Sequence, residues 1–568
     1  MKKIGIDFGT TYSTICYVDE SFQPGDGNYL LPYKTGDGDT LIPTAVAYHI
    51  DDASTSVLVG RAALDMVDNP EYHVCRHFKM LLALEGTLLL EQFIAEHPDY
   101  DMYTKHAPSK VAHDFFVNIL GWYQDDYKVG QIEKIVLTIP LVWRGFDEQS
   151  HENTGAAEKL LSQALQAASL KACGGKHKLK VDIRSEPEAA AGYFAYLYKL
   201  QHGQCLNGQM LVVDHGGGTL DVTLAEVAHS EEGIKVASKA RSGKGRQLDY
   251  ALGVAGVAYD RALAELALQN AKRTLEGADL SEFLDRLEYC KRQGGARTSL
   301  NDFHTKGSNN LAMNVKGVRI MPALCKQAFT AVNEQPLQQA LQEVFQEHRE
   351  ALKSQNLHVA MAGGFSNLPF VEHQVRRYFG AKEDIDDKSD KRFALSTLAQ
   401  RTHAIAMGAA LVAAQKVTIE EKLLYEIGVY VYTIDRGEVY EPVIAYGIEY
   451  KQLQQVIWMS TPVQGGAEGA KLGLKNSGRT DRAALPFLLK HLNDGKNRLG
   501  AVSAKSMVPD YEPGCHYLIG FSVPPDEDDV SGRHDLTIHF RNKVTGNESA
   551  FPIGEVLTKF SNLIYKVQ

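Results

Sequence analysis

Two stretches of the chain each place an aspartate after an apolar run and before a glycine turn. They are residues 3–13 (KIGIDFGTTYS) and residues 211–223 (LVVDHGGGTLDVT). Glycine tolerates positive φ, so the backbone N–H groups of such turns can close around an anion such as phosphate. Asp7 and Asp214, each at the end of its run, can hold a hydrated Mg²⁺, which uses only one or two carboxylates. Together the two stretches predict a duplicated phosphate clamp around one metal-bound nucleotide.

Each stretch alone has a simpler explanation, because an aspartate at the end of a strand often only caps a turn. The repetition of the same arrangement favours the phosphate site. Other nucleotide-binding motifs are missing from the sequence. Every Gly-Lys pair lacks the earlier glycine of a Walker loop, and no G-x-G-x-x-G follows a strand and opens a helix.

The elements that must position these residues follow an α/β pattern as far as Gln415, with strand-like runs alternating with helical stretches. The expected strands are Ile4–Phe8, Ile135–Thr138, Met210–Val213 and His358–Met361. The expected helices are Val111–Gln124, Glu158–Ala168, Tyr259–Arg273, Leu284–Gln293 and Pro336–Lys353. The charged run Glu383–Lys391 is an expected solvated loop. Residues 1–415 are therefore predicted to form an α/β domain.

After Gln415 the pattern becomes β-rich. The expected strands are Ile427–Thr433 and Asp535–Arg541, and Pro524–Asp529 is an expected loop. Leu557, Phe560 and Ile564 have helical spacing and predict one short helix. Residues 416–568 are predicted to form a separate β-rich domain.

Composition excludes several classes of protein. At 568 residues the chain is too long for one hydrophobic core. Its net charge of −10 argues against a general nucleic-acid binder. The seven cysteines form no C-x-x-C pair, which disfavours a zinc site or a disulfide framework. No apolar run approaches the roughly 18 residues of a membrane span, and the first strand leaves no room for a signal peptide. We expect a cytoplasmic protein without a membrane or nucleic-acid partner.

Further motifs narrow the interpretation of the two aspartate–glycine stretches to one family. Residues 359–369 (VAMAGGFSNLP) combine an apolar, strand-like run with a Gly-Gly turn. With residues 5–13 and 214–221, this segment resembles the phosphate and adenosine motifs of the actin-like ATPase superfamily, and within it the heat-shock-70 (DnaK-type) chaperones. Ile139-Pro140 and residues 406–410 (AMGAA) resemble the two interdomain connectors of that family. The five motifs occur in the order of the family.

The resemblance implies a bilobal actin-like ATPase domain, of the duplicated ribonuclease-H-like kind, followed by the β-rich domain. Residues 78–80, 136–143 and 363–365 resemble the divergent member-12 branch, whereas Tyr12 is more similar to the ordinary chaperones.

The resemblance also implies ATP/ADP and Mg²⁺ as cofactors. Its implied metal-binding residues are Asp7, Asp214 and Asp221. Its implied catalytic residues are Lys79, Glu186, Asp214 and Thr219. Phosphate-binding donors are expected from Gly9, Thr10, Thr11, Tyr12, Gly216, Gly217, Gly218 and Thr219.

Lys79 and Glu186 each have a structural alternative. Lys79 matches the family lysine beside the γ-phosphate, where a cation stabilises the charge of the transferring group. Its alternative is a solvated lysine on an amphipathic helix. Glu186 lies in a helix start, with Ser185 as the N-cap and Glu188 completing a capping box. Glu186 can face the metal and the attacking water from the same turn.

Two segments compete for the base pocket, residues 271–275 (AKRTL) and residues 288–292 (EYCKR). The second offers Glu288, Lys291 and Arg292 on one helix face. It also lies at the expected interval before residues 320–329, which resemble the family segment that follows this helix. We therefore choose residues 288–292 for the base pocket. The alternative is that these residues form only a solvated, charged face of a helix.

The adenosine turn is expected to contribute Gly363, Gly364, Ser366 and Asn367. Asn367 stands where ordinary members carry an arginine that stacks on the base, and Thr402 replaces an acidic residue. Both departures bear on how the base is bound.

The function implied by the resemblance is an ATP-hydrolysing chaperone-like protein. Hydrolysis would move a hinge near Pro140 and Gly408 and gate binding of a protein or peptide client by the C-terminal domain. A co-chaperone or nucleotide-exchange factor is an expected partner. We expect no long helical lid of the kind that ordinary members carry, because the predicted β-rich domain uses nearly all of the residues after Gln415. An ATP-dependent regulatory protein without general chaperone activity is the alternative, and a filament-forming protein or a small-molecule kinase of the same fold ranks third.

Overall fold

The computed structural model describes most of the chain up to residue 420 and selected segments beyond it. The described residues are 2–51, 57–82, 84–86, 88–128, 132–141, 155–172, 180–230, 233–245, 253–346, 348–354, 356–420, 425–433, 437–445, 448–460, 463–464, 470–476, 483–485, 498–499, 502–503, 516–522 and 537–552. They fall into two compact units, one ending at Ile419 and one beginning at Glu420.

The first unit contains two sheets with related strand orders. The order in the first sheet is β3 (Leu30–Pro32), β2 (Tyr12–Val18), β1 (Lys3–Asp7), β8 (Lys134–Ile139) and β9 (Lys180–Ser185). The order in the second is β16 (Val417–Glu420), β12 (Gly233–Lys244), β11 (Leu220–Ser230), β10 (Gly208–His215) and β15 (Leu357–Ala362).

The central strands of the two sheets occupy matching places. In each sheet the central strand, β1 or β10, pairs antiparallel with the strand that follows it. On its other side each central strand pairs parallel with a later strand, β8 or β15. Because parallel strands need a crossover, each pairing encloses long helical segments. We call the parts built on these sheets lobe I and lobe II.

Two helices fill the space between the lobes. They are α6 (Glu186–His202) and α14 (Ala404–Ala413). α6 packs on β10, β11 and β12, α14 packs on β1, β2 and β8, and the two helices pack against each other. Small side chains such as Ala189 and Ala409 allow this approach, and both are fully buried. The faces of both sheets are apolar because helices cover them.

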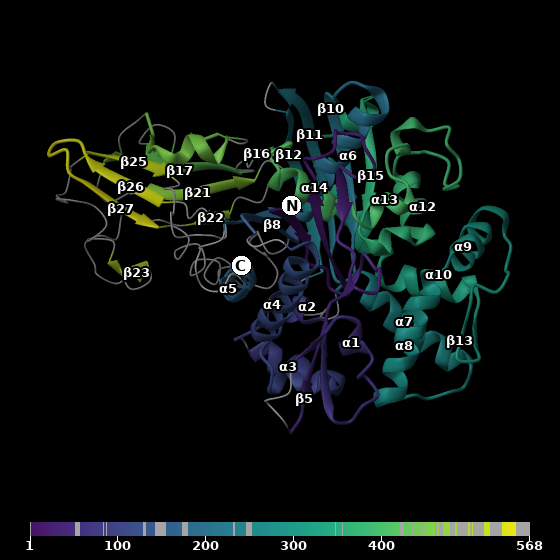
Figure 1. Cartoon of the computed structure of the whole chain (residues 1–568). Helices are drawn as coiled ribbons and strands as arrows, with labels where there is room; N and C mark the ends of the chain where they lie inside the picture. Colours follow the sequence, from purple (N-terminus) through teal and green to yellow (C-terminus); the bar gives the residue numbers. More distant parts are fainter. Residues whose placement is uncertain are drawn as a thin grey trace. The chain divides into compact units, whose positions relative to one another are not determined.

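Outer helices cover the remaining faces (Figure 1). Lobe I carries α1 (Arg61–Leu64), α2 (Phe78–Leu81), α3 (Leu88–Glu96), α4 (Pro108–Tyr127) and α5 (Gly155–Ala172), with a small sheet of β6 (Leu58–Val59), β5 (Ala45–His49) and β7 (Tyr72–Arg76). Lobe II carries α7 (Gly256–Asn270), α8 (Gly277–Lys291), α9 (Gly294–Lys306), α10 (Pro322–Val332), α11 (Glu334–Phe345), α12 (Pro369–Tyr378) and α13 (Leu398–Arg401). Along β10, Leu211 and Val213 join the outer core of lobe II, while Met210 and Val212 face the core around α6.

The described part of the second unit is composed mainly of strands. One sheet has the order β18 (Gly437–Ile444), β17 (Tyr425–Thr433), β21 (Ala470–Asn476) and β22 (Ala483–Leu485). Another has the order β19 (Ile457–Trp458), β25 (His516–Ser522), β26 (Thr537–Asn542) and β27 (Glu548–Pro552), with β20 (Val463–Gln464) also paired to β25.

Most expected elements form with shifted ends, and one differs. The helix expected over Pro336–Lys353 stops at Phe345, and a separate 3₁₀ turn follows at Ala351–Lys353. The helical apolar spacing ends with Val344 and Phe345, and Ala351 returns to the same core from the separate 3₁₀ turn. The loop expected at Pro524–Asp529 and the helix expected around Leu557–Ile564 lie outside the described residues. No helix in the described ranges is long and apolar enough to cross a bilayer.

Candidate nucleotide and metal site

Each lobe presents an aspartate at the end of its central strand, opposite a residue of the next strand. Asp7 of β1 faces Thr14 of β2. Asp214 of β10 faces Asp221 of β11. The two hairpins share this register, so the position that holds a hydroxyl in lobe I holds a second carboxylate in lobe II.

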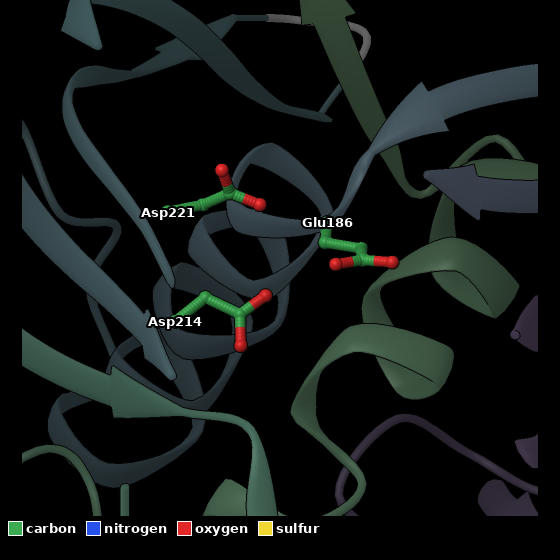
Figure 2. A group of neighbouring side chains, drawn as sticks. All are labelled: Glu186, Asp214 and Asp221. Carbon is green, nitrogen blue, oxygen red and sulfur yellow. The ribbon is translucent and has the colours of Figure 1, made fainter. Parts of the chain in front are cut away.

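Three buried carboxylates converge in front of lobe II. Glu186, Asp214 and Asp221 bring one oxygen each within 4.8 Å of one another, and Figure 2 shows the three groups facing a shared space. Burial and the nearby Glu186 raise the pKa of Asp214 and of Asp221 well above its usual value. Asp214 Oδ2 and Asp221 Oδ1 are buried without a hydrogen-bond partner. Buried carboxylates that repel one another and keep two oxygens without a donor suit a hard cation such as Mg²⁺.

Asp7, expected to be a metal ligand with Asp214 and Asp221, is not one of the three carboxylates that meet within 4.8 Å, and its role as a ligand stays a prediction. The structure brings Glu186 close to those two carboxylates instead. Burial, together with the nearby Glu186, raises the pKa of Asp7 to about 7, and Lys79 opposes the shift. Asp7 therefore interacts electrostatically with Glu186 and Lys79 from the side of lobe I.

Lys79 is buried and forms an ion pair with Glu186. Its Nζ lies 2.6 Å from Glu186 Oε1 and 5.8 Å from the ring centre of Phe8. α2, which begins at Phe78, presents Lys79 toward the inside of the protein. The alternative of a solvated lysine is wrong. The pair places a cation beside the carboxylate group.

Glu186 is the first residue of α6, directly after β9. Ser185 occupies the N-cap position, as expected, but its side chain makes no capping hydrogen bond. The Ser185 hydroxyl donates instead to Glu188 Oε2 at 2.5 Å, and Ser238 donates to Oε1 of the same residue at 2.5 Å. The expected capping box is therefore wrong, because Glu188 is buried between two hydroxyls. Glu186 is left to face the site.

The glycine turn of lobe II lies against the turn of lobe I. A Cβ built on Gly217 would lie 2.8 Å from Thr11 Oγ1, and one built on Gly218 would lie 2.9 Å from Thr10 Oγ1. The first N–H groups of α7 donate to the carbonyls of Gly216 (3.1 Å) and Gly217 (2.8 Å). Thr219, whose carbonyl accepts from the Gly216 N–H at 3.0 Å, closes the turn. Only glycine fits this approach, so the two predicted phosphate turns face each other.

The segment chosen for the base pocket lies at the end of α8 and contacts both lobes. Lys291 is half-buried and bonds both oxygens of Asp260, at 2.7 Å and 2.6 Å. The Arg292 guanidinium lies 4.6 Å from the ring centre of Tyr12 in lobe I. The competing residues 271–274 are exposed just beyond α7. The choice of Glu288, Lys291 and Arg292 for the base pocket stays a prediction.

Asp260 is a residue that the sequence did not single out. It lies on α7, packed against α8, and carries no motif that could have marked it. Burial raises the pKa of Asp260 to about 6, and Lys291 opposes that shift. Asp260 and Glu288 both line a cavity of about 270 Å³ between α7, α8 and the β7–η1 region, whose lining also includes Thr11; η1 is Pro98–Thr104.

Ion pairs cross this cavity from lobe to lobe. Arg76 of β7 lies 2.5 Å from Asp285 of α8. Arg261 of α7 pairs with Asp99 of η1. These contacts hold the outer parts of the two lobes together beside the predicted base pocket.

The adenosine turn follows β15. Gly363 has φ +79°, and a 3₁₀ turn, η5 (Gly364–Asn367), comes next. The Ser366 hydroxyl donates to the Gly363 carbonyl at 2.7 Å. The Asn367 carbonyl accepts from Arg297 of α9 at 2.8 Å, an arginine that the sequence analysis missed.

Comparison with known proteins matches these features to one family. The family model described as "Hsp70 protein" matches residues 180–432. Chaperone protein DnaK of Thermotoga neapolitana is 24% identical over 461 residues, which cover 78% of this chain and 65% of the relative. Chaperone protein DnaK of Thermotoga maritima is 23% identical over 463 residues, with the same coverage. That of Stenotrophomonas maltophilia is 23% identical over 424 residues, covering 70% of this chain and 59% of the relative.

The aligned region thus spans about 65% of the first of these relatives. The duplicated sheets, the facing glycine turns and the matched residues agree with one another. The chain is similar to the heat-shock-70 family over residues 180–432.

Proposed function

We propose that the first unit binds Mg-ATP between its lobes and hydrolyses it slowly to ADP and phosphate. The observation that carries the proposal is the buried group of Glu186, Asp214 and Asp221, paired with Lys79 at the point where two glycine turns meet. Such a charge arrangement is costly in a folded protein and is typical of functional sites.

Different residues of the site would bind the metal, stabilise the transferring group and bind the phosphates. Asp214 and Asp221 would hold Mg²⁺, with Asp7 acting from the opposite lobe. The metal, when bound, would neutralise phosphate charge and orient the phosphate oxygens. Lys79 would stabilise the charge that develops on the transferring group, and Glu186, held by Lys79, would orient the attacking water. The glycine turns and Thr10, Thr11, Tyr12 and Thr219 would donate to the phosphates.

The site has a direct link to the first connector. The Leu141 N–H, one residue after Pro140, donates to Asp221 Oδ2 at 3.2 Å. The second connector lies in α14, which packs on both α6 and β1. A change in the charge held by Asp221 therefore reaches a hinge segment through a single hydrogen bond.

We further propose a chaperone-type cycle, in which the nucleotide state controls binding of a protein or peptide client by the region after Gln415. The similarity to DnaK chaperone proteins supports this proposal. A co-chaperone or nucleotide-exchange factor would act on the first unit.

The test measures binding of Mg-ATP by calorimetry and then binding of an unfolded apolar peptide with ATP and with ADP. Lys79→Ala is the control for coupling, because it should retain nucleotide while hydrolysis is lost. We expect ATP binding and a peptide affinity that differs between the two nucleotides. Absence of ATP binding would reject the site. ATP binding without peptide binding in either state would instead favour a regulatory protein with a dedicated partner.

A further inference from the structure

We propose that Arg401 is a positioning residue for the nucleoside: it holds the adenosine turn from behind by bridging the Ser366 carbonyl and a buried glutamate, Glu372. The proposal rests on the proposed function, because it assigns a role toward the nucleotide of the same site. Arg401 lies at the end of α13, outside every motif that the sequence displayed.

The adenosine turn is built directly on the lobe II clamp. A Cβ on Gly363 would lie 2.4 Å from Asp214 Oδ1 and 2.6 Å from the His215 carbonyl, so the backbone of the turn lies against the metal-binding strand end. A displacement of the turn would therefore separate the nucleoside from the phosphate clamp. What fixes the turn thus matters for binding.

The guanidinium of Arg401 holds the adenosine turn in place. Its Nη1 donates to the Ser366 carbonyl at 3.0 Å, and its Nη2 donates to Glu372 Oε2 at 2.6 Å and to the Ser396 carbonyl at 3.3 Å. Arg401 is 4% exposed. Because the peptide unit is planar, holding the Ser366 carbonyl also fixes the direction of the Asn367 N–H. A planar, rigid guanidinium can serve both acceptors at once.

A second arginine contacts the same glutamate but not the turn. Arg376 Nε donates to Glu372 Oε1 at 2.8 Å. Its Nη1 donates to the carbonyls of Lys382 and Asp387, each at 3.4 Å. Within the described residues, these are the hydrogen bonds of Arg376. Arg376 is buried like Arg401, and each is one half of the Glu372 network.

The turn also carries an unsatisfied group. Asn367 Oδ1 is buried and has no hydrogen-bond partner, while the Asn367 carbonyl is held by Arg297. The last two carbonyls of η5, those of Ser366 and Asn367, each accept a hydrogen bond from an arginine, so the turn is held in one conformation. The polar side chain of Asn367 remains available to a ligand.

The experiment compares Arg401→Gln with Arg376→Gln in the full chain. Each substitution removes one ion pair to Glu372, so we expect similar drops in thermal midpoint. We expect Arg401→Gln to weaken Mg-ATP binding about tenfold by calorimetry, the usual size for one charge-assisted hydrogen bond. Arg376→Gln should bind Mg-ATP as the wild type does. The single-turnover rate at saturating ATP should be unchanged in both variants.

Arg401→Lys and Arg376→Lys give the same comparison should a glutamine variant fail to fold. Lysine keeps a charge beside Glu372 but cannot bridge two acceptors in the same plane. Equal ATP affinity of the Arg401 and Arg376 variants overturns the positioning role. A wild type that does not bind Mg-ATP rejects the proposed function itself, which is a different outcome.

Discussion

The β1–β2 hairpin of lobe I and the β10–β11 hairpin of lobe II share the same backbone pairing, but they differ in the number of charged side chains. Both carry an aspartate at the end of the central strand, and both pair it with the residue seven positions later. That partner is Thr14 in lobe I and Asp221 in lobe II. Lobe II thus has two carboxylates on adjacent strands, and Glu186 from α6 adds a third.

The two turns are also supported differently. The lobe I turn receives a hydrogen bond from the Thr44 N–H to the Thr11 carbonyl at 2.8 Å. In lobe II, carbonyls of the turn accept two N–H groups from the start of α7. We infer that duplication supplied the frame and that divergence made lobe II the metal side. Lobe I then contributes phosphate donors and Lys79.

The largest expected effect tests this division of labour. Asp214→Asn and Asp7→Asn should each abolish Mg-dependent turnover, with a loss of about 100-fold or more. Only Asp214→Asn and Asp221→Asn should also remove the rise in thermal midpoint that Mg²⁺ causes, because those two carboxylates share the group with Glu186. In EDTA, Asp214→Asn and Asp221→Asn should each be more stable than the wild type, since each variant loses a buried carboxylate whose pKa is raised.

Differential scanning fluorimetry with and without Mg²⁺ provides the measurement. Near-normal ATPase in Asp7→Asn or Asp214→Asn would reject the clamp. An equal loss of the Mg²⁺ response in the Asp7 and Asp214 variants would remove the distinction between the lobes.

Lys79→Ala should have the next largest effect. Removal of the cation should lower the single-turnover rate about 100-fold, as the loss of one transition-state donor does. It also leaves Glu186 buried without its ion pair, so we expect a lower thermal midpoint in EDTA that Mg²⁺ partly restores. Lys110→Ala is a matched control, because its ion pair with Asp114 involves a side chain that is 60% exposed. A Lys79 variant with a normal rate would place the lysine outside the chemistry.

Much of the frame could be read from the sequence, because local pattern determines it. Aspartate, glycine and hydroxyl residues after an apolar run specify a strand, a turn and a second strand, and both hairpins formed. Glu186 could be identified because it opens a predicted helix and matches a glutamate of the heat-shock-70 motif. Each of these features lies within a few residues of its signal.

Contacts set by tertiary packing could not be read in this way. The register of β10 and β11 and the position of α6 bring Asp221 and Glu186 to Asp214, and no local pattern marks that meeting. Lys291 binds Asp260 of a different helix, and Arg401 reaches Ser366 through the packing of α13 on η5. Charged residues on helices are common, and nothing local marks the few that turn inward.

A smaller effect tests the contact between the two turns. Gly217→Ala places a methyl group 2.8 Å from Thr11 Oγ1, so the turns must move apart. We expect Mg-ATP affinity to fall about tenfold, because misplacing positioning groups is costly, while the thermal midpoint stays near that of wild type. Gly121→Ala in α4 is the control: its Cβ meets nothing within 4 Å, and alanine is the better helix former. Unchanged ATP affinity in Gly217→Ala would mean that the turns do not act as a pair.

The smallest expected effect is a pH dependence confined to the outer layer of lobe II. His373 of α12 stacks on His304 at 4.0 Å and contacts Asn301 Oδ1 through Nε2 at 2.9 Å. Burial, with the neighbouring His304, lowers the pKa of His373 to about 3, from an ordinary value near 6.5. Between these pH values the unfolded chain binds more protons than the folded one, so the free energy of unfolding falls as the pH falls from 6.5 toward 3.

His373→Gln keeps an amide donor for Asn301 and removes this titration. Hydrogen exchange at pH 5 should be faster than at pH 7 in α9 and α12 of the wild type, after correction for intrinsic rates, and this difference should shrink in the variant. Glu383 and Lys326 also act on His373, so a residual slope is expected. The β1–β2 hairpin of lobe I should show no response to His373→Gln. A response there equal to that in α12 would mean that the lobes open as one cooperative unit, and that their difference in charge does not extend to their stability.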